Sequence, residues 1–302
     1  MKDMTKRTDL AKEAVDLYCE TMPAPGMPDG VRSSEKDICG MHVFTVEILN
    51  ENGSEIIGKP VGKYVTIDLE PLFANTDHAF QEAVDVISGE LSSFLPSNGE
   101  SPLLVAGLGN RAITPDALGP IAVENVLATR HLLRQMPEQF SMLKPVTAVA
   151  PGVLAMTGIE SGEMLTGIAG KIAPGALIAI DALAARRTER LCKTVQISNT
   201  GIVPGSGVGN HRFAINTETM HIPCIAVGVP TVVDAATLAA DILDDLQISY
   251  EATPLYEKYG QTFVTGKEID RQVAACAKVI GYAINRAAQP ELSLDDIALF
   301  LS

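Results

Sequence analysis

Two aspartates in this 302-residue chain each follow a short apolar run. Asp116 lies between two prolines in "VAGLGNRAITPDALGP", and Asp181 is the last residue of "ALIAID" (176–181). We predict that the two runs are neighbouring strands of a parallel sheet, in a flavodoxin-like order. Because sites in such sheets form at the carboxyl ends of the strands, both carboxylates should face one edge.

Two facing carboxylates suit hydrolysis of a peptide bond without a covalent intermediate. The ionised carboxylate takes a proton from water, and the protonated one donates a proton to the amide that is cleaved. Like charges held close together and partly buried favour this division of roles. The alternative is that each aspartate caps a turn or a helix, for example Asp181 ahead of "ALAARRTER". The expected pairing of Asp116 with Asp181 favours catalysis.

Other motifs near these aspartates predict chemistry less strongly. "GLGNRA" (107–112) matches the G-x-G-x-x-A pattern of dinucleotide sites, but a Thr-Pro-Asp turn separates it from the next helix and would repel a phosphate. The five histidines form no H-E-x-x-H pattern, so a zinc-peptidase motif is missing. The basic run "ARRTERLCK" (185–193) is either a solvated helix face or a cradle for an acidic substrate side chain.

The elements that must position these residues follow from the hydrophobic pattern. Apolar runs alternate with helical segments, which predicts an α/β fold with a mostly parallel sheet and helices on both faces. Two runs at about residues 40–70, joined by "NENGSE", predict a small N-terminal β hairpin or pair of strands. The run before Asp116 spans 102–107, and we expect further strands at 145–152, 193–198 (at an edge) and 222–230. Helices are expected at 78–95, 118–134, 160–172, 234–246 and 267–288, the last in a helical C-terminal tail.

Composition and charge exclude several classes of protein. Hydrophobic residues make up 46% and charged residues 20%, which is typical of a globular protein. A formal net charge of −14 argues against a general nucleic-acid or anionic-membrane binder. Five scattered cysteines indicate free thiols in a reducing compartment, and the chain shows neither a signal peptide nor a membrane-length apolar run. We expect a cytoplasmic protein.

Six motifs together resemble the germination protease (spore protease) family, over roughly residues 7–236. They are "VAGLGN", "TPDALGP", "APGVLAMTGIES", "IAIDALAAR", "QISNTGIVPGSGVGNHR" and "IPCIAVGVPTVVDA". The resemblance implies an endopeptidase (a hydrolase) that degrades small acid-soluble spore proteins in the forespore or spore core during germination. It also implies a fold similar to the hydrogenase-maturation proteases and a homotetramer. The tail after Leu246 looks shorter than in the family.

The resemblance also implies roles for particular residues. Asp116 and Asp181 would be the catalytic pair of an aspartic mechanism, with no cofactor and no metal. Arg186, inside a matching motif, is predicted to bind the acidic side chain beside the cleaved bond. Two other classes stay open: a metal-dependent maturation-type peptidase with Asp116 as a ligand, and a nucleotide- or cofactor-dependent enzyme. An inactive structural homologue is a third alternative.

The N-terminus repeats the order of residues at which the family cuts its substrates. Those substrates are cleaved after an acidic residue and before a large apolar residue followed by Ala, and Asp9-Leu10-Ala11 has that order. We therefore predict a zymogen in which self-cleavage between Asp9 and Leu10 removes residues 1–9 as a mobile propeptide. Residues 10–302 would form one peptidase domain. The alternative is that Asp9 caps the helix that begins at Leu10.

Overall fold

The structure is a computed structural model that describes residues 6–21, 26–74, 78–96, 101–204 and 213–302. Its strands are β1 (Val31–Ile38), β2 (Met41–Ile48), β3 (Gly62–Asp68), β4 (Leu103–Gly107), β5 (Val146–Val149), β6 (Ala176–Ala185), β7 (Thr194–Ser198), β8 (Cys224–Asp234) and β9 (Phe263–Val264). Its α-helices are α1 (Ala11–Thr21), α2 (Glu51–Ile57), α3 (Ala79–Ser92), α4 (Leu118–Glu124), α5 (Arg130–Gln135), α6 (Leu154–Thr157), α7 (Ser161–Ile172), α8 (Thr217–Met220), α9 (Ala235–Asp245), α10 (Ala252–Tyr259), α11 (Ile269–Ala288) and α12 (Leu294–Leu301). Short 3-10 turns are η1 (Glu70–Phe73), η2 (Thr114–Asp116) and η3 (Thr188–Arg190).

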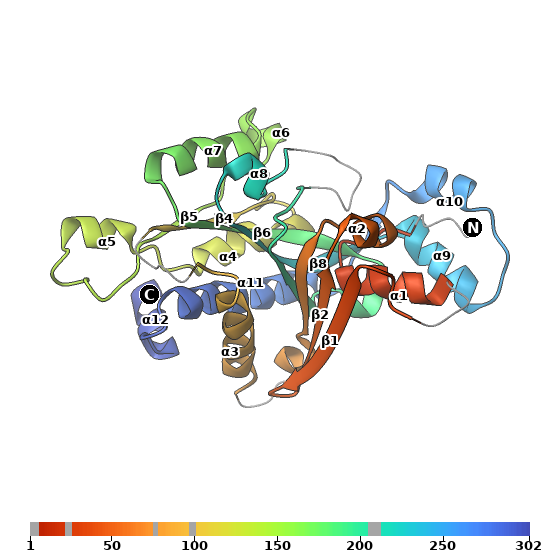
Figure 1. Ribbon diagram of the computed structural model, residues 1–302, viewed down its shortest axis with the longest axis horizontal. Coiled ribbons are helices and arrows are strands. Elements are labelled where there is room, and N and C mark those ends of the chain that lie inside the picture. The colour runs from red at the N-terminus through yellow and green to blue at the C-terminus, as the bar shows by residue number, and fades with distance from the viewer. Residues whose placement is uncertain (1–5, 22–25, 75–77, 97–100, 205–212) are drawn as a thin grey trace.

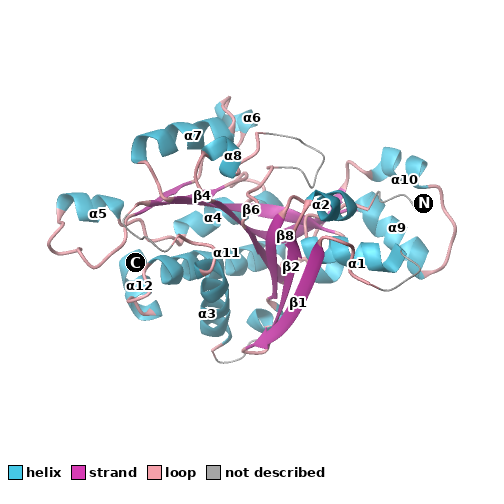
Figure 2. Ribbon diagram, viewed as in Figure 1, coloured by secondary structure: helices cyan, strands magenta, loops and turns pink. Residues whose placement is uncertain are grey.

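One mixed sheet joins all of these strands in the order β1-β2-β3-β7-β8-β6-β4-β5, with β9 paired to β8. The strands β8, β6, β4 and β5 are parallel, whereas β7, β3, β2 and β1 each pair antiparallel with their neighbour. Helices α3, α4 and α11 lie on one face, and α7 and α8 lie on the other (Figure 1). The sheet turns strongly from β4 towards β1 (Figure 2). The predicted α/β fold is therefore confirmed.

The two faces of β6 can be told apart by their apolar partners. Ile178 and Ile180 belong to the large core cluster that contains α3 and α11. Leu177 and Ala179 belong to a second cluster, which includes residues of α7 and α8. Because side chains alternate along a strand, Asp181 points to the same face as Leu177 and Ala179.

Strand β6 is longer than predicted. It continues past Asp181 to Ala185, because residues 182–185 pair with β8 and are mostly buried. The prediction that Asp181 ends its strand is therefore wrong. The alternative that Asp181 caps a helix is also wrong, because no helix begins there.

Strand β7 is not at an edge, so that prediction is wrong too. It lies between β3 and β8 and pairs antiparallel with both. The N-terminal strands cause the difference, because they extend the parallel part of the sheet across β7. The predicted runs at 41–49 and 62–69 form β2 and β3, which pair antiparallel. The "NENGSE" segment between them forms much of helix α2 rather than a turn, with Asn50 as its N-cap.

The predicted helix at 118–134 is two helices, α4 and α5, separated by residues 125–129. A buried asparagine of α11 causes the break. The Leu127 N–H donates to Oδ1 of Asn285 at 2.7 Å, and Nδ2 of Asn285 donates to the carbonyl oxygen of Asn125 at 2.8 Å. The chain between the two helices is thus bound to α11.

Candidate active site

The loop that leaves β4 carries Asp116 and passes very close to its own backbone. A Cβ on Gly107 would lie 2.1 Å from the carbonyl oxygen of Gly119. One on Gly109 would lie 2.1 Å from the carbonyl oxygen of Asp116. Gly109 also has a φ of +108°, which favours glycine. The glycines of "GLGNRA" therefore make room for the chain itself, and this accounts for the motif without a dinucleotide.

Hydrogen bonds fix the turn that holds Asp116. Its Oδ2 accepts from the backbone N–H of Asn110 at 2.8 Å. Oγ1 of Thr231, on β8, donates to the carbonyl oxygen of Pro115 at 2.7 Å. Oγ1 of Thr114 donates to a carboxylate of α11 at 2.8 Å. The turn is thus tied to the sheet and to α11.

Asp181 lies on β6, one residue past the end of the pairing with β4. The Leu108 N–H donates to the carbonyl oxygen of Ile180 at 2.8 Å, as the chain leaves the sheet for the Asp116 loop. The Asp181 side chain is buried, and its Oδ1 accepts from the Ala182 N–H at 2.9 Å.

The two aspartates therefore come from two neighbouring parallel strands, Asp116 from the loop that leaves β4 and Asp181 from β6, one residue past the pairing of the two strands. β4 pairs directly with β6, as the sequence predicts. The turn η2, which contains Asp116, also packs against β6 and β8. Carboxylates placed in this way can bind a water molecule, accept its proton and donate a proton to a leaving group.

The predicted cleavage site, Asp9–Leu10, is anchored in the fold. The Asp9 N–H donates to the Ala184 carbonyl oxygen at 2.8 Å, and the Asp9 carboxylate accepts from the Ala184 N–H at 2.8 Å. Leu10 is fully buried in a cluster with Leu183 and Leu191. The alternative that Asp9 caps helix α1 is wrong, because its carboxylate binds β6.

Residues 6–8 are also held in place, so the expected mobile terminus is wrong for this segment. Lys6 forms ion pairs with Asp241 and Asp244 of α9. Nη1 of Arg7 lies 3.3 Å from Oδ2 of Asp234 and donates to the carbonyl oxygen of Gly260 at 2.9 Å. Residues 1–5 of the predicted propeptide lie outside the described residues.

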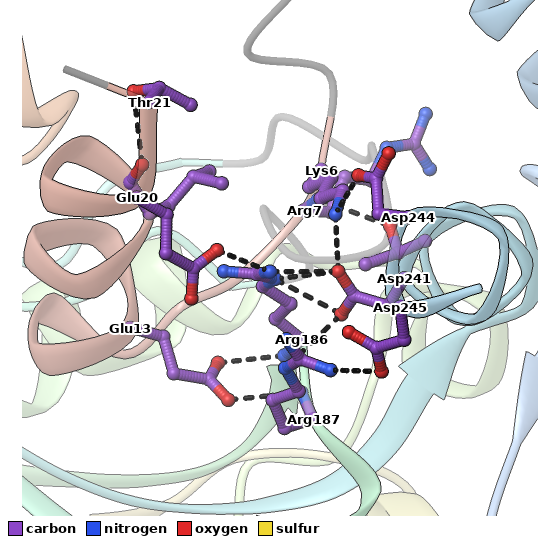
Figure 3. Close-up of polar contacts among 12 residues, drawn as sticks. Lys6, Arg7, Glu13, Glu20, Thr21, Arg186, Arg187, Asp241, Asp244 and Asp245 are labelled. Carbon is purple, nitrogen blue, oxygen red and sulfur yellow. Dashed lines mark hydrogen bonds and ion pairs between the residues drawn. The ribbon is translucent and has the colours of Figure 1, made fainter. Parts of the chain in front are cut away.

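Arg186 lies within a buried ion-pair cluster rather than at an open site (Figure 3). Its Nη2 lies 2.8 Å from Asp241 and 2.7 Å from Glu20, and its Nε donates to Asp241 at 2.9 Å. Burial alone would lower the pKa of Arg186, but the bonds to Asp241 and Glu20 raise it above its usual value. The guanidinium therefore already binds two carboxylates in this structure.

A cavity of about 480 Å³ lies on the sheet face that Asp181 shares. Its lining includes Gln196 and Ser198 of β7, Gly228 of β8, Leu183 of β6 and, on another side, the anchored segment 6–9. The N-terminal segment thus forms part of the wall of a cavity with mixed polar and apolar lining, beside the strand that carries Asp181.

The sequence of this chain is similar to known proteins over most of its length. The family model described as germination protease matches residues 11–251. Germination protease of Clostridium perfringens is 42% identical, and the alignment covers 98% of this chain and 99% of that protein. The chain belongs to the germination protease family. It is therefore a peptidase by family, as the sequence predicts.

Other germination proteases match a different share of the chain. Germination protease of Priestia megaterium is 47% identical over 79% of this chain and 66% of that protein, and the Bacillus subtilis protein is 43% identical over the same shares. Among solved structures, a [NiFe] hydrogenase maturation protease from Thermococcus kodakarensis aligns with 65% of this chain and 98% of that chain, at 14% identity and a TM-score of 0.36.

In the part of the chain that the structure describes, no group of three or more His, Cys, Asp or Glu side chains is placed to hold a metal ion. None of its helices combines the length and the apolar character that a membrane span needs.

Several residues around this candidate site were not predicted from the sequence. Gln196 binds the N-terminal segment through both ends of its amide. Nζ of Lys59 donates to the Thr8 carbonyl oxygen at 2.8 Å, and burial lowers the pKa of Lys59 despite the nearby carboxylates. Glu13 accepts from the N–H groups of residues 186 and 187, and burial raises its pKa. Residues of these types are common on surfaces, and only the docking of the N-terminus buries them.

Proposed function

We propose that this chain is an endopeptidase that degrades small acid-soluble spore proteins during germination, using Asp116 and Asp181. The observation that carries the proposal is the position of the two aspartates where β4 ends: Asp116 lies in the loop that leaves β4, and Asp181 lies on the paired parallel strand β6, one residue past that pairing. Membership of the germination protease family supports the substrate class.

In the proposed mechanism one aspartate is ionised and the other is protonated. The ionised carboxylate takes a proton from a water molecule, which attacks the carbonyl carbon of the scissile bond. The protonated carboxylic acid donates its proton to the amide nitrogen as the C–N bond breaks. Asp181 is buried, and in the proposed mechanism a buried carboxyl group close to a second carboxylate favours the sharing of one proton. The geometry fits either assignment of the two roles.

We also propose that the chain is a zymogen whose residues 1–9 are removed by cleavage between Asp9 and Leu10. Asp9 is bound at Ala184, three residues beyond Asp181, or about 10 Å along the strand. At that distance the Asp9–Leu10 bond cannot reach the Asp181 carboxylate. Self-cleavage therefore requires Asp9 to leave β6 and residues 6–7 to leave their partners at α9, Asp234 and Gly260, so that the bond can reach the site of the same chain or of another copy.

The predicted role of Arg186 remains a proposal in modified form. Its contact with Asp241 is fully buried, whereas its second partner, Glu20, has a side chain that is 49% exposed. A substrate carboxylate could replace Glu20 without exposing Asp241. The proposed enzyme is a homotetramer that acts in the cytoplasm of the forespore or in the spore core.

The test is digestion of a purified acid-soluble spore protein, with the products identified by mass spectrometry. The proposal predicts cuts after an acidic residue and before a large apolar one, with no effect of a chelator. An intact spore protein after incubation with processed enzyme would contradict the substrate class. Inhibition by the chelator that is reversed by added metal would favour the metal-dependent alternative.

A further inference from the structure

Gln196 lies in the same row of the sheet as Asp181. Both residues are register partners of Gly228, Asp181 from β6 and Gln196 from β7. Register partners point to the same face of a sheet, and two strand spacings separate their Cα atoms by about 10 Å. Gln196 therefore faces the side of the sheet that carries the proposed catalytic carboxylate.

The amide of Gln196 binds main-chain atoms on both sides of the Asp9–Leu10 bond. Its Nε2 donates to the Asp9 carbonyl oxygen at 3.1 Å, and its Oε1 accepts from the Ala11 N–H at 2.7 Å. The side chain is buried, at 8% exposure. A buried amide thus uses both of its ends to hold a polypeptide segment by its backbone.

Removal of residues 1–9 would change the surroundings of the Gln196 side chain in two ways. Nε2 would lose the Asp9 carbonyl oxygen, and a buried donor without an acceptor is unfavourable. The cavity of about 480 Å³ would lose the side formed by Lys6, Arg7, Thr8 and Asp9 and would open next to Gln196. Ser198 and Thr200 line it together with apolar residues such as Ile202, so the opened cavity offers hydrogen-bond partners for a main chain and apolar surface for side chains.

We propose that Gln196 binds the main chain of the polypeptide substrate, with Nε2 donating to a substrate carbonyl oxygen in the place that the Asp9 carbonyl oxygen occupies here. This inference rests on the proposed function. Gln196 is a positioning residue: it aligns the substrate across β6, β8 and β7 and transfers no proton. Because it contacts backbone atoms, it contributes affinity for any sequence, whereas side-chain preference comes from other groups.

The test compares Gln196→Met with Gln289→Met in the processed enzyme. Gln289 is a matched control, because its buried amide also binds one backbone segment through both ends, accepting from the Lys144 N–H and donating to the Lys144 carbonyl oxygen. Lys144 precedes β5, so this amide lies at the amino ends of the parallel strands. Gln196→Glu, which keeps the acceptor and loses the donor, serves as the second variant.

Steady-state cleavage of a spore-protein peptide gives the first readout. Gln196→Met and Gln196→Glu should raise KM about tenfold, the effect of one lost hydrogen bond, and change kcat much less. Gln289→Met should leave KM unchanged even where it lowers the melting temperature. An unchanged KM in both Gln196 variants would overturn the inference while leaving the proposed function intact.

Competition gives the second readout and uses wild-type enzyme, so it does not depend on maturation of a variant. A synthetic acetyl-Lys-Arg-Thr-Asp peptide, which has the sequence of residues 6–9, should inhibit cleavage competitively. Absent or non-competitive inhibition would overturn the inference. Absence of any cleavage by processed wild-type enzyme would instead contradict the proposed function.

Discussion

Gly109 and Asp116 are in backbone contact: a Cβ on Gly109 would lie 2.1 Å from the Asp116 carbonyl oxygen and 2.9 Å from its Oδ1. The position of the Asp116 carboxylate therefore depends on a residue seven positions earlier that has no side chain. The contact also explains why a glycine-rich motif precedes the aspartate.

Gly109→Ala should lower the rate of spore-protein cleavage about 100-fold, because a displacement of about 1 Å at a catalytic group can have that effect. Gly170→Ala is the control, since the space around Gly170, on helix α7, is open among the described residues. Rates and urea unfolding curves should be measured for both variants. Normal turnover by Gly109→Ala would mean that the Asp116 loop need not be held where it lies here.

Arg186→Ala should lower the free energy of unfolding by about 3–5 kcal/mol, because it leaves the buried Asp241 carboxylate without its main partner. This loss of stability is additional to the role predicted from the sequence, in which Arg186 binds an acidic substrate side chain. Arg187→Ala is the control and should cost about 1 kcal/mol or less, since Arg187 is partly exposed, its Nε lies 3.6 Å from Asp241, and its nearer partner, Asp245, is exposed. Equal urea midpoints for the two variants would contradict the role of the cluster.

Lys6→Gln should speed the cleavage of the full-length chain at the Asp9–Leu10 bond, because it removes the ion pairs that hold residue 6 to Asp241 and Asp244. Lys12→Gln removes a pair within α1, with Asp16, and should leave the rate unchanged. Intact-mass measurements over time should find Leu10 as the new N-terminus in both. An unaltered rate in Lys6→Gln would show that this contact does not restrain processing.

Glu13 should make stability depend on pH. Burial raises its pKa above the usual value of 4.5, so the folded chain holds this proton more tightly than the unfolded chain does. Relative to Glu13→Gln, the free energy of unfolding of the wild type should be greatest below the unfolded pKa. It should fall as the pH rises through the folded pKa, by up to about 1.4 kcal/mol per pH unit.

Urea unfolding between about pH 4.5 and about pH 8 measures this difference. Both proteins should also carry Asp116→Asn, so that processing does not change the chain during the experiment. A difference that grows with pH would contradict the raised pKa of Glu13.

The parallel part of the fold was predictable because its strands are continuous apolar runs followed by helices. The pairing of β4 with β6 follows from right-handed crossovers, and it places Asp116 and Asp181 at one edge. Strand β1 was missed because its sequence, "VRSSEKDI", is mostly polar and exposed. Strands β2 and β3 were predicted, but the pairing of β3 with β7 was not, so β7 was predicted at an edge.

The contacts of the N-terminus could not be predicted in the same way. Lys6, Arg7 and Asp9 are ordinary surface residues by type, and their partners lie more than 170 positions away in β6, α9 and the loop after α10. Such long-range polar contacts leave no periodic signal. The burial of Arg186 was hidden for the same reason, since Asp241 and Glu20 come from distant helices.

The most direct test of the account is cleavage of a spore protein by the Asp116→Asn, Asp181→Asn and double variants. Each is matured by a small amount of wild-type enzyme, and that enzyme's own contribution is subtracted. Each single variant should fold normally and lose at least 10²–10⁴-fold in kcat, because one step of the proton transfer is removed. The double variant should be hardly worse than either single variant, as for residues that act as a unit. Turnover at the wild-type rate by either single variant would contradict the aspartate pair.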